Sequence, residues 1–411
     1  MRVVVCGRVG KELCTVSEKS LLNRHIPALD GLRALAVLAV IAIDVHMYYG
    51  QFVSGPISGP LSAMLTCGWA GVDLFFVLSG FLITGILYDT KGGDGYFRTF
   101  YARRTLRIMP LYFGYVFVII VLGRLSCPFF SWIDGGDAAS LGLYVYNFRE
   151  VYTERFPAVY HHFWSLAVEE HFYLIWPLAV WSLRRRPLMR LCLAGAVASF
   201  WLRVIVVQSG MSPLIPYFVT PCRLDGLLAG SFVALAWRDQ ADWIRLRRWA
   251  GPVVAGSGGL LLGILLGRGR LDAHAEAGGG LVMTVGFTVL AVFFSGLIVL
   301  AVDAPEGNRW RQFLENKGLR AIGKYSYGIY VFSPLILNVV GRLLWPLSQA
   351  PAYIAKPVGI IWVLAASFGA AWLSYHLYEK HFLRLKRFFE YRKPAVLPVL
   401  PPSVLVSYQK S

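Results

Sequence analysis

One apolar stretch near the N-terminus carries ionisable side chains and limits what this chain can fold into. Residues 26–46 read IPALDGLRALAVLAVIAIDVH, with Arg33 near the start and Asp44 and His46 near the end. A helix of about 20 apolar residues spans a bilayer, and an ionisable group within it is costly unless it faces a protein interior. Arg33 and Asp44 would lie roughly 16 Å apart along such a helix. We therefore expect a spanning helix with functional groups towards both membrane faces.

The composition is that of a membrane protein with many spans. Of the 411 residues, 56% are hydrophobic and only 15% are charged, against about 25% charged residues in soluble domains. The net charge of +17 fits cytoplasmic loops that are rich in Lys and Arg, so we expect membrane lipids and not nucleic acid as partners. The six cysteines have no CxxC spacing, which argues against a zinc site or a disulfide framework.

The fold class that we expect is an all-α integral membrane protein with about ten transmembrane helices. Basic residues collect in alternate connections between the apolar windows, which predicts that both termini are cytoplasmic. We interpret residues 1–25 as a cytoplasmic extension, 26–387 as the membrane domain and 388–411 as a flexible cytoplasmic tail. The ten windows are 32–49, 69–88, 109–124, 166–183, 190–208, 217–236, 250–267, 280–302, 326–344 and 357–377.

Three arginines beside the third window form a dense basic cluster. Arg103, Arg104 and Arg107 lie within about one helical turn, so two or three of them can converge on one anion. The simpler explanation of the cluster is that these arginines only orient the helix in the membrane by the positive-inside rule. The cluster is, however, denser than orientation requires. We expect a phosphate-rich cytoplasmic ligand here.

Charged residues inside the second, fourth and sixth windows are further candidates. Asp73 lies in the second window, and Arg223 and Asp225, at the start of the sixth, cannot share a helix face, so each should pair with another helix. The fourth window follows HHFWSLAVEEHFYLIWP, residues 161–177, whose aromatics alone would form an interfacial belt. His162, Glu169 and Glu170 within it suggest more, because a glutamate can hold an imidazole in one tautomer.

Seven stretches of the chain, in order, match the motifs of a known family. They are LDGLR at 29–33, GVDLFFVLSGFLI at 71–83, RRTLRIMP at 103–110, HFWSLAVEEHFYL at 162–174, RLDGLLAG at 223–230, YSYGIY at 325–330 and YEKHFLRL at 378–385. On these motifs the chain resembles the acyltransferase-3 family of multi-pass membrane O-acyltransferases, which modify bacterial surface and secreted glycans. The resemblance implies a ten-span protein of the bacterial inner membrane that moves an acyl group, usually acetyl, from cytoplasmic acyl-CoA to a sugar hydroxyl.

The resemblance also implies roles for individual residues. Arg104 and Arg107 are the pair expected to bind the CoA phosphates, and we place Arg33 and Arg103 at the same donor site. No metal is required, and the partners would be a glycan or lipid-linked sugar, membrane lipids and, in a homodimer, a second copy. Glu169 or Glu170 would orient the base or the acceptor, and the acceptor would contact Asp73, His162, Trp164, Ser165, Tyr173, Arg223 and Asp225.

Two positions depart from the family pattern. The histidine expected eleven residues after Arg33 is replaced by Asp44, and Ser333 precedes the proline of the ninth window where the family often has histidine. Three explanations stay open. Asp44 is itself the base, or His46 takes over after a local change in the helix, since two residues rotate a helix by about 200°, or the fold is kept and acyl transfer is lost.

A transporter or flippase of an amphipathic substrate is the rival class. Asp44, Asp73 and Asp225 would then be proton-coupling groups within the membrane. Against it, the sequence has no evident inverted repeat. A catalytically inactive scaffold is the third alternative, and it predicts CoA binding without turnover.

Overall fold

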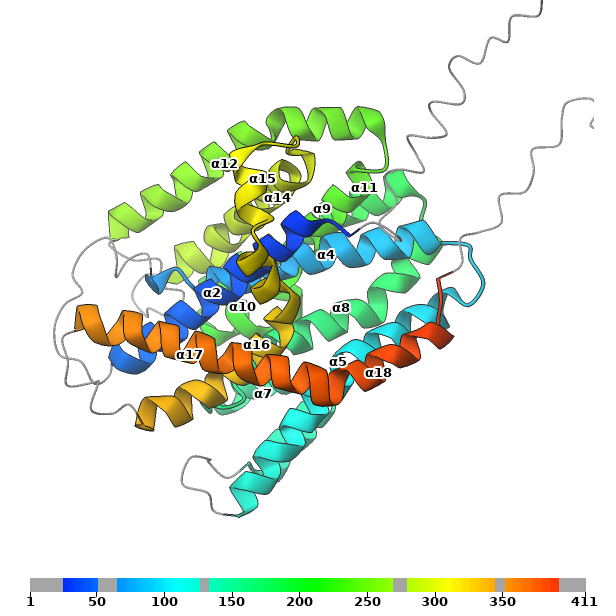
Figure 1. Ribbon diagram of the computed structural model, residues 1–411. Coiled ribbons are helices and arrows are strands. Elements are labelled where there is room, and N and C mark those ends of the chain that lie inside the picture. Colours follow the sequence, from blue (N-terminus) through cyan, green and yellow to red (C-terminus); the bar gives the residue numbers. More distant parts are fainter. Residues whose placement is uncertain (1–24, 51–64, 126–132, 269–278, 344–351, 392–411) are drawn as a thin grey trace, which may run out of the picture.

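The chain folds into a bundle of long helices. The computed structural model describes residues 25–50, 65–125, 133–268, 279–343 and 352–391 (Figure 1). Within those ranges the chain forms helices and connecting loops and no strand, which confirms the predicted all-α class. The predicted extension over 1–25 and tail over 388–411 lie almost entirely outside the described residues.

Short helices on the connections alternate with the long ones. The elements are α2 (Pro27–Gly50), α4 (Ala70–Thr90), α5 (Tyr96–Arg124), α6 (Gly135–Gly142), α7 (Tyr146–Thr153), α8 (Phe163–Ser182), α9 (Arg185–Gln208), α10 (Leu214–Phe218), α11 (Thr220–Ala236), α12 (Gln240–Arg268), α13 (Gly279–Leu281), the π-helical η1 (Val282–Gly286), α14 (Phe287–Asp303), α15 (Arg309–Leu314), α16 (Lys317–Leu343), α17 (Ala352–Ser374), the π-helical η3 (Tyr375–Glu379), α18 (Lys380–Arg384) and the 3₁₀-helical η4 (Leu385–Phe388).

Each apolar window of the sequence falls on a long helix or on a run of consecutive helices in the described part of the chain. Among the residues that the structure describes, seven segments are long and apolar enough to cross a membrane, namely α4, α5, α9, α10–α11, α12, η1–α14 and α17 with the helices that follow it. The protein is therefore a multi-pass membrane protein. The remaining long helices, α2, α8 and α16, carry several of the candidate site residues, and the full number of about ten spans stays a prediction.

Three helices begin well before their apolar windows. Helix α5 begins at Tyr96, α12 at Gln240 and α16 at Lys317, although the windows predicted starts near residues 109, 250 and 326. The extra turns are rich in Lys and Arg, so regular helix continues past the apolar region into a basic one. As a result, Arg104 and Arg107 are carried on a rigid element and not on a loop.

Helices α4 and α11 touch closely at two glycines. A Cβ added to Gly80 of α4 would overlap the carbonyl of Leu227, and one added to Gly230 of α11 would overlap the carbonyl of Val77. Small residues permit such close backbone approach between membrane helices. Helix α2 packs on α4 and on α16, so α2, α4 and α16 form a compact frame for the site.

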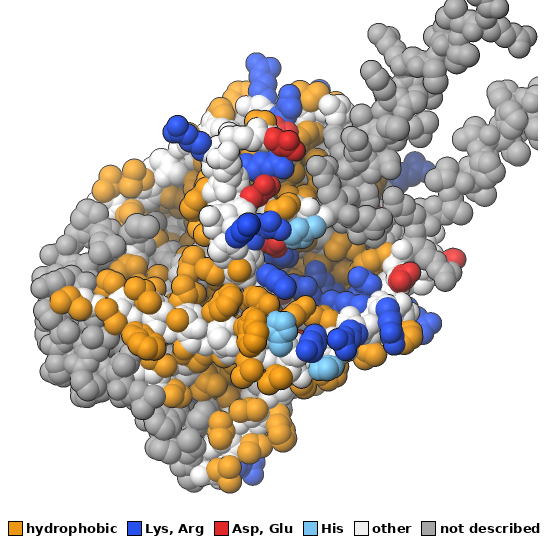
Figure 2. Space-filling model, viewed as in Figure 1, with side chains coloured by type: hydrophobic (Ala, Val, Ile, Leu, Met, Phe, Trp, Pro, Cys, Tyr) orange, Lys and Arg blue, Asp and Glu red, His pale blue; other side chains and the backbone are white. Residues whose placement is uncertain are grey.

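The two ends of the bundle differ in charge. We call the end where α4 and α8 finish and α5 and α9 begin the basic end, and the end that carries α6, α7 and the last turns of α2 the opposite end. Figure 2 shows Lys and Arg side chains gathered over the start of α5 and over α18, next to a largely hydrophobic surface over α17. The site described next follows this polarity.

Candidate active site

Helix α2 carries candidate residues towards both ends of the bundle. It is an uninterrupted α-helix from Pro27 to Gly50, on which Arg33 and Asp44 are roughly 16 Å apart. Arg33 lines one cavity nearer the basic end, and Asp44 lines a second cavity nearer the opposite end. The candidate residues are therefore distributed over two cavities, called here the arginine cavity and the histidine cavity.

The arginine cavity brings together the predicted donor and carboxylate residues. Its volume is about 110 Å³, and its walls come from α2, α4, α5, α8 and α16. The sequence-predicted residues that share it are Arg33, Arg104, Arg107, Ser165, Glu169, Glu170 and Tyr173. They come from three helices that are far apart in the sequence, so one enclosed space joins both groups of residues.

Glu169 is held in place by two hydroxyl groups. Ser79 Oγ donates to its Oε1 at 3.0 Å, and the Tyr173 hydroxyl donates to its Oε2 at 2.5 Å. Glu169 and Tyr173 are four residues apart and share one face of α8. The guanidinium of Arg104 lies 4.8 Å from the centre of the Tyr173 ring, a cation–π arrangement. The carboxylate thus orients the tyrosine, and the tyrosine supports the arginine.

Arg104 and Arg107 face this cavity without a carboxylate at ion-pair distance among the described residues. Neither forms an ion pair or donates a hydrogen bond in the part of the chain that the structure describes, and the Arg107 side chain stays exposed there. Arg33 has a long contact of 3.4 Å with Asp30. Guanidinium groups bind phosphate or carboxylate oxygens through two parallel hydrogen bonds, so the cavity is suited to an anion.

Arg103 points away from the arginine cavity. It donates to the carbonyls of Lys386 at 3.1 Å and Phe389 at 2.8 Å, and its guanidinium lies 4.9 Å from the centre of the Tyr391 ring. The side chain thus joins α5 to the segment that follows α18. The structure places Arg103 outside the group formed by Arg104 and Arg107.

Glu170 adds a second carboxylate beside Glu169. It lines the arginine cavity, and its Oε1 is buried without a hydrogen bond. A buried polar atom that lacks a partner costs about 1–3 kcal/mol. Such an atom marks a place where a ligand group or water would complete the site.

One hydrogen-bonded layer separates the two cavities. The hydroxyls of Ser165 and Tyr330 are 2.7 Å apart, and the Tyr330 hydroxyl donates to the carbonyl of His162 at 2.8 Å. Ser165 and Tyr330 line the arginine cavity, whereas the side chain of His162 lines the histidine cavity. All three residues are buried. We call them the tyrosine layer.

The histidine cavity has a volume of about 200 Å³ and mixed walls. Helix α2 supplies Asp44 and two neighbours, the segment before α8 supplies His161 and His162, and α16 supplies Asn338. The two neighbours on α2 are Met47 and Tyr48, and the remaining lining residues are Phe156, Ala158, Pro334 and Leu337. An acid and two imidazoles therefore face one space that a polar substrate group can enter.

His161 is paired with a buried acid on α7. Its Nδ1 lies 2.6 Å from Oε1 of Glu150, whose side chain is 0% exposed, while the His161 side chain is 32% exposed. Burial raises the pKa of Glu150 to about 6 although His161 opposes this. Burial alone would lower the pKa of His161, but Glu150 and, more weakly, Asp44 raise it above its usual value. A protonated imidazole is thus stabilised at this position.

His46 lies on another face of α2. The residues of α2 that line the histidine cavity are Asp44, Met47 and Tyr48, which share one face at helical spacing. Two residues rotate a helix by about 200°, and the helix is regular through this region. The local change in the helix that would bring His46 to the position of Asp44 is not present in the structure.

The other predicted polar residues form buried ion pairs outside the two cavities. Arg223 on α11 donates to Asp73 on α4 at 2.9 Å, and Asp225 accepts from Arg203 on α9 at 2.7 Å. This confirms that Arg223 and Asp225 pair with different helices. Trp164 is 3% exposed, and its ring lies 5.8 Å from the Arg223 guanidinium. These four predicted acceptor-binding residues therefore pack between helices and do not line either cavity.

Several residues of the site were missed by sequence reasoning. Arg203 had a usable signal, because a lone arginine inside an apolar window needs a buried partner. Tyr330 and Ser79 lie within motifs that were noticed only for their resemblance. Glu150 and His161 gave no clear signal, because a short connecting helix shows no pattern that places its acid against a distant histidine.

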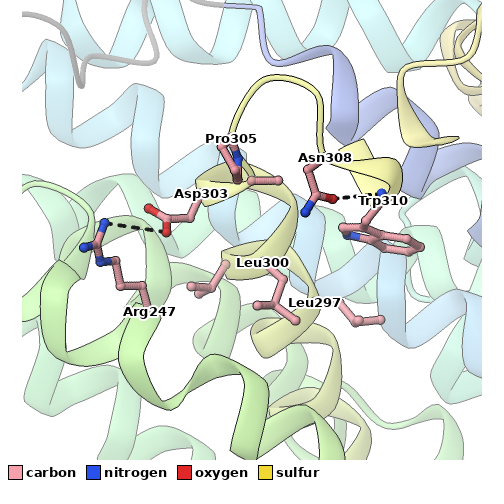
Figure 3. A pocket seen from close by; sticks show the side chains of 9 residues that line it. Arg247, Leu297, Leu300, Asp303, Pro305, Asn308 and Trp310 are labelled. Atoms are coloured by element: carbon pink, nitrogen blue, oxygen red, sulfur yellow. Dashed lines mark hydrogen bonds and ion pairs between the residues drawn. The ribbon is translucent and has the colours of Figure 1, made fainter. Parts of the chain in front are cut away.

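A larger cavity, of about 430 Å³, lies elsewhere in the bundle. Figure 3 shows it between α12, α14 and the start of α15, with Arg247 and Asp303 3.8 Å apart and Asn308 Oδ1 accepting from the amide of Trp310 at 2.8 Å. None of the sequence-predicted site residues lines it, so volume alone does not locate the candidate site. Among the described residues, no group of three or more His, Cys, Asp or Glu side chains is arranged to hold a metal ion.

Comparisons with known proteins give the family. A family model described as an acyltransferase domain, Acyl_transf_3, matches residues 26–376. Similar proteins are the peptidoglycan O-acetyltransferase OatA of Listeria monocytogenes (29% identical over 390 residues, 90% of this chain and 58% of the relative), the O-acetyltransferase OatA of Staphylococcus aureus (27% over 423 residues, 95% and 64%) and the putative peptidoglycan O-acetyltransferase YrhL of Bacillus subtilis (29% over 380 residues, 87% and 55%). This chain spans about three-fifths of the length of these relatives, and no solved structure matches it. The match covers nearly all of the helix bundle, and the chain belongs to the acyltransferase-3 family, as its motifs predicted.

Proposed function

We propose that the protein is a membrane O-acetyltransferase that moves an acetyl group from cytoplasmic acetyl-CoA to a hydroxyl of a cell-wall carbohydrate. Family membership supports acyl transfer, and the names of the relatives support O-acetylation of peptidoglycan. The donor is supported by one observation above all. Arg104 and Arg107 converge on one cavity and form no ion pair within the described residues.

The size of the arginine cavity fits one end of the donor. Sites for whole small molecules have volumes of about 300–1,000 Å³, whereas this cavity measures about 110 Å³. It has room for a phosphate group or for the thioester end of a pantetheine arm. The nucleotide end of CoA would then lie outside the cavity, over the basic surface at the start of α5 (Figure 2).

The basic end is the cytoplasmic end in this proposal. Lys and Arg collect there, as the positive-inside rule requires of cytoplasmic connections. The histidine cavity then opens towards the outer face, where a cell-wall carbohydrate is found. The two termini of the membrane domain would both be cytoplasmic, and the thioester end of the pantetheine arm would reach past the tyrosine layer, so that the acetyl group meets the acceptor in the histidine cavity.

The chain's own residues divide the work between the two cavities. Arg104 and Arg107 bind the donor phosphate, and Glu169, through Tyr173, keeps Arg104 in place. A base in the histidine cavity takes the proton of the acceptor hydroxyl, and the oxygen attacks the acyl carbonyl. The carbon–sulfur bond of the thioester breaks, and the thiolate is protonated as CoA leaves.

Acetyl transfer by the purified protein in nanodiscs tests this proposal. The donor is acetyl-CoA with a labelled acetyl group, and soluble peptidoglycan fragments serve as acceptors. We expect Arg104→Gln and Arg107→Gln each to raise the KM for acetyl-CoA about 10- to 100-fold, because a hydrogen bond to a charged group contributes about 1.5–3 kcal/mol. Arg245→Gln is the control, since Arg245 is an exposed arginine on α12, away from the start of α5, and lines neither cavity.

Two results would contradict the proposal in different ways. CoA binding without turnover by the wild type, with several carbohydrate acceptors, would indicate the inactive scaffold. The protein can also be placed in closed lipid vesicles. Movement of a lipid-linked sugar across the vesicle membrane, without use of acetyl-CoA, would indicate the transporter. Equal KM values for acetyl-CoA in the Arg104, Arg107 and Arg245 variants would remove the donor assignment.

A further inference from the structure

The histidine cavity contains an imidazole that neither the sequence nor the family match assigns. His161 lies in the connection between α7 and α8, next to the start of α8, and its side chain contributes to the wall of the cavity. Its ring is fixed on two sides by edge contacts, 5.3 Å from the ring centre of Phe156 and 5.6 Å from that of Phe218. The ring is therefore held in one orientation although a third of the side chain is exposed.

The hydrogen bond with Glu150 decides which nitrogen of His161 is basic. Glu150 is a buried acceptor beside Nδ1, at 2.6 Å, so in the neutral ring the proton is assigned to Nδ1 and the lone pair to Nε2. Within the described residues, Nε2 has no hydrogen-bond partner. A carboxylate on one nitrogen and an accessible lone pair on the other are the features of an oriented general base.

Asp44 completes the electrostatics of the cavity. It lines the same space from α2, and its charge acts on His161. When His161 takes up a proton, the imidazolium is stabilised by Glu150 on α7 and by Asp44 on α2, while His162 is the neighbouring imidazole. Asp44 thus stabilises the protonated base, and Glu150 positions it.

We infer that His161 is the general base of the acceptor site, with Glu150 as its positioning residue. The inference rests on the proposed function. Nε2 of His161 takes the proton of the carbohydrate hydroxyl while the hydroxyl oxygen forms a bond to the acyl carbon. The carbon–sulfur bond of the donor thioester breaks, and the proton passes from Nε2 to the departing thiolate, so the imidazole ends each cycle neutral.

The test measures acetyl transfer from labelled acetyl-CoA to soluble peptidoglycan fragments in nanodiscs. We expect His161→Ala to lower kcat by about 10²- to 10⁴-fold, the usual contribution of general base catalysis, with the KM for acetyl-CoA unchanged. Added imidazole should restore part of the rate, because the truncated side chain leaves room for it in the cavity. His25→Ala is the matched control, since His25 forms a similar pair with Asp30 at 2.7 Å but lines neither cavity.

The pH dependence of Glu150→Gln gives a second readout that a purely structural role would not produce. The base acts in its neutral form, so the rate rises with pH through the pKa of His161. Glu150 holds that pKa above its usual value. Its replacement by Gln should therefore move the rise in rate to lower pH and lower the maximal rate.

The possible outcomes separate this inference from the proposed function. Acetyl transfer by the wild type with an unchanged rate in His161→Ala overturns the inference alone. A loss of acetyl transfer in His161→Ala that imidazole does not restore, combined with an unshifted pH profile in Glu150→Gln, also overturns the inference alone. So does an active His161→Ala variant when Asp44→Asn or His46→Ala is inactive. No transfer by the wild type overturns the proposed function, and this inference with it.

Discussion

At the scale of single residues, two buried arginines are held in the bundle by acids from neighbouring helices. Arg223 and Arg203 have side chains that are 1% and 0% exposed, and each donates to one aspartate. Arg223 also lies over the ring of Phe287, 3.6 Å from its centre. Taking two charges out of water is costly, and their attraction repays this only when both partners are present.

Removal of one partner of the Arg223–Asp73 pair should destabilise the fold strongly. We expect Arg223→Met to cost about 3–5 kcal/mol, because it leaves the carboxylate of Asp73 buried and unpaired. The double variant Arg223→Met with Asp73→Asn should recover most of that loss, because it leaves no unpaired charge. Denaturation in mixed micelles measures both, with the exposed Arg248→Met as the control. A double variant as unstable as Arg223→Met would contradict this account.

Single residues were predictable where the cost of burying charge is high. Arg33, Asp44 and the two glutamates of α8 were predictable because an ionisable group in an apolar window is costly unless it is paired or functional. Whether such a group lines a cavity or pairs with another helix depends on how helices rotate against each other. For that reason the sequence did not separate Arg103, which joins α5 to the segment after α18, from Arg104, which faces a cavity.

At the scale of helices, the contact of α4 with α11 depends on the absence of two Cβ atoms. We expect Gly80→Ala to destabilise the protein by about 1–3 kcal/mol, because the methyl group meets the backbone of Leu227 and the helices must separate. Gly259→Ala is the control on α12, where an added Cβ meets nothing within 4 Å, and it should be neutral or slightly stabilising. Equal melting temperatures for the two variants would show that α4 and α11 adjust without cost.

Hydropathy located the helices well and the starts of three of them poorly. The ten windows each fall on a long helix, because apolar length is what a bilayer selects. The first turns of α5, α12 and α16 are basic and lie outside the apolar windows, since a hydropathy window ends where charged residues begin. Helical propensity does not end there, because Arg and Lys are good helix formers.

At the scale of the whole molecule, the charge difference between the ends predicts which end faces the cytoplasm. Cysteines introduced one at a time can show which side of the membrane each end faces. The two positions are Asp94, in the exposed turn before α5, and Glu154, in the exposed turn after α7. We expect a membrane-impermeant maleimide to label Asp94→Cys only from the cytoplasmic side and Glu154→Cys only from the outer side. The chain without an added cysteine gives the background. Labelling of both positions from the same side would refute the proposed orientation.

The tyrosine layer has an electrical consequence. If water fills the two cavities, it carries each bulk phase inward, so most of the membrane potential falls across the few ångströms occupied by Ser165, Tyr330 and the backbone of His162. A unit charge that crosses 100 mV requires or releases about 2.3 kcal/mol, so an ion would meet almost the whole voltage at this one place. The pantetheine arm and its acetyl thioester are neutral, so in the proposed function they would cross the layer without electrical work. The layer would then allow acetyl transfer across the membrane without dissipating the membrane potential.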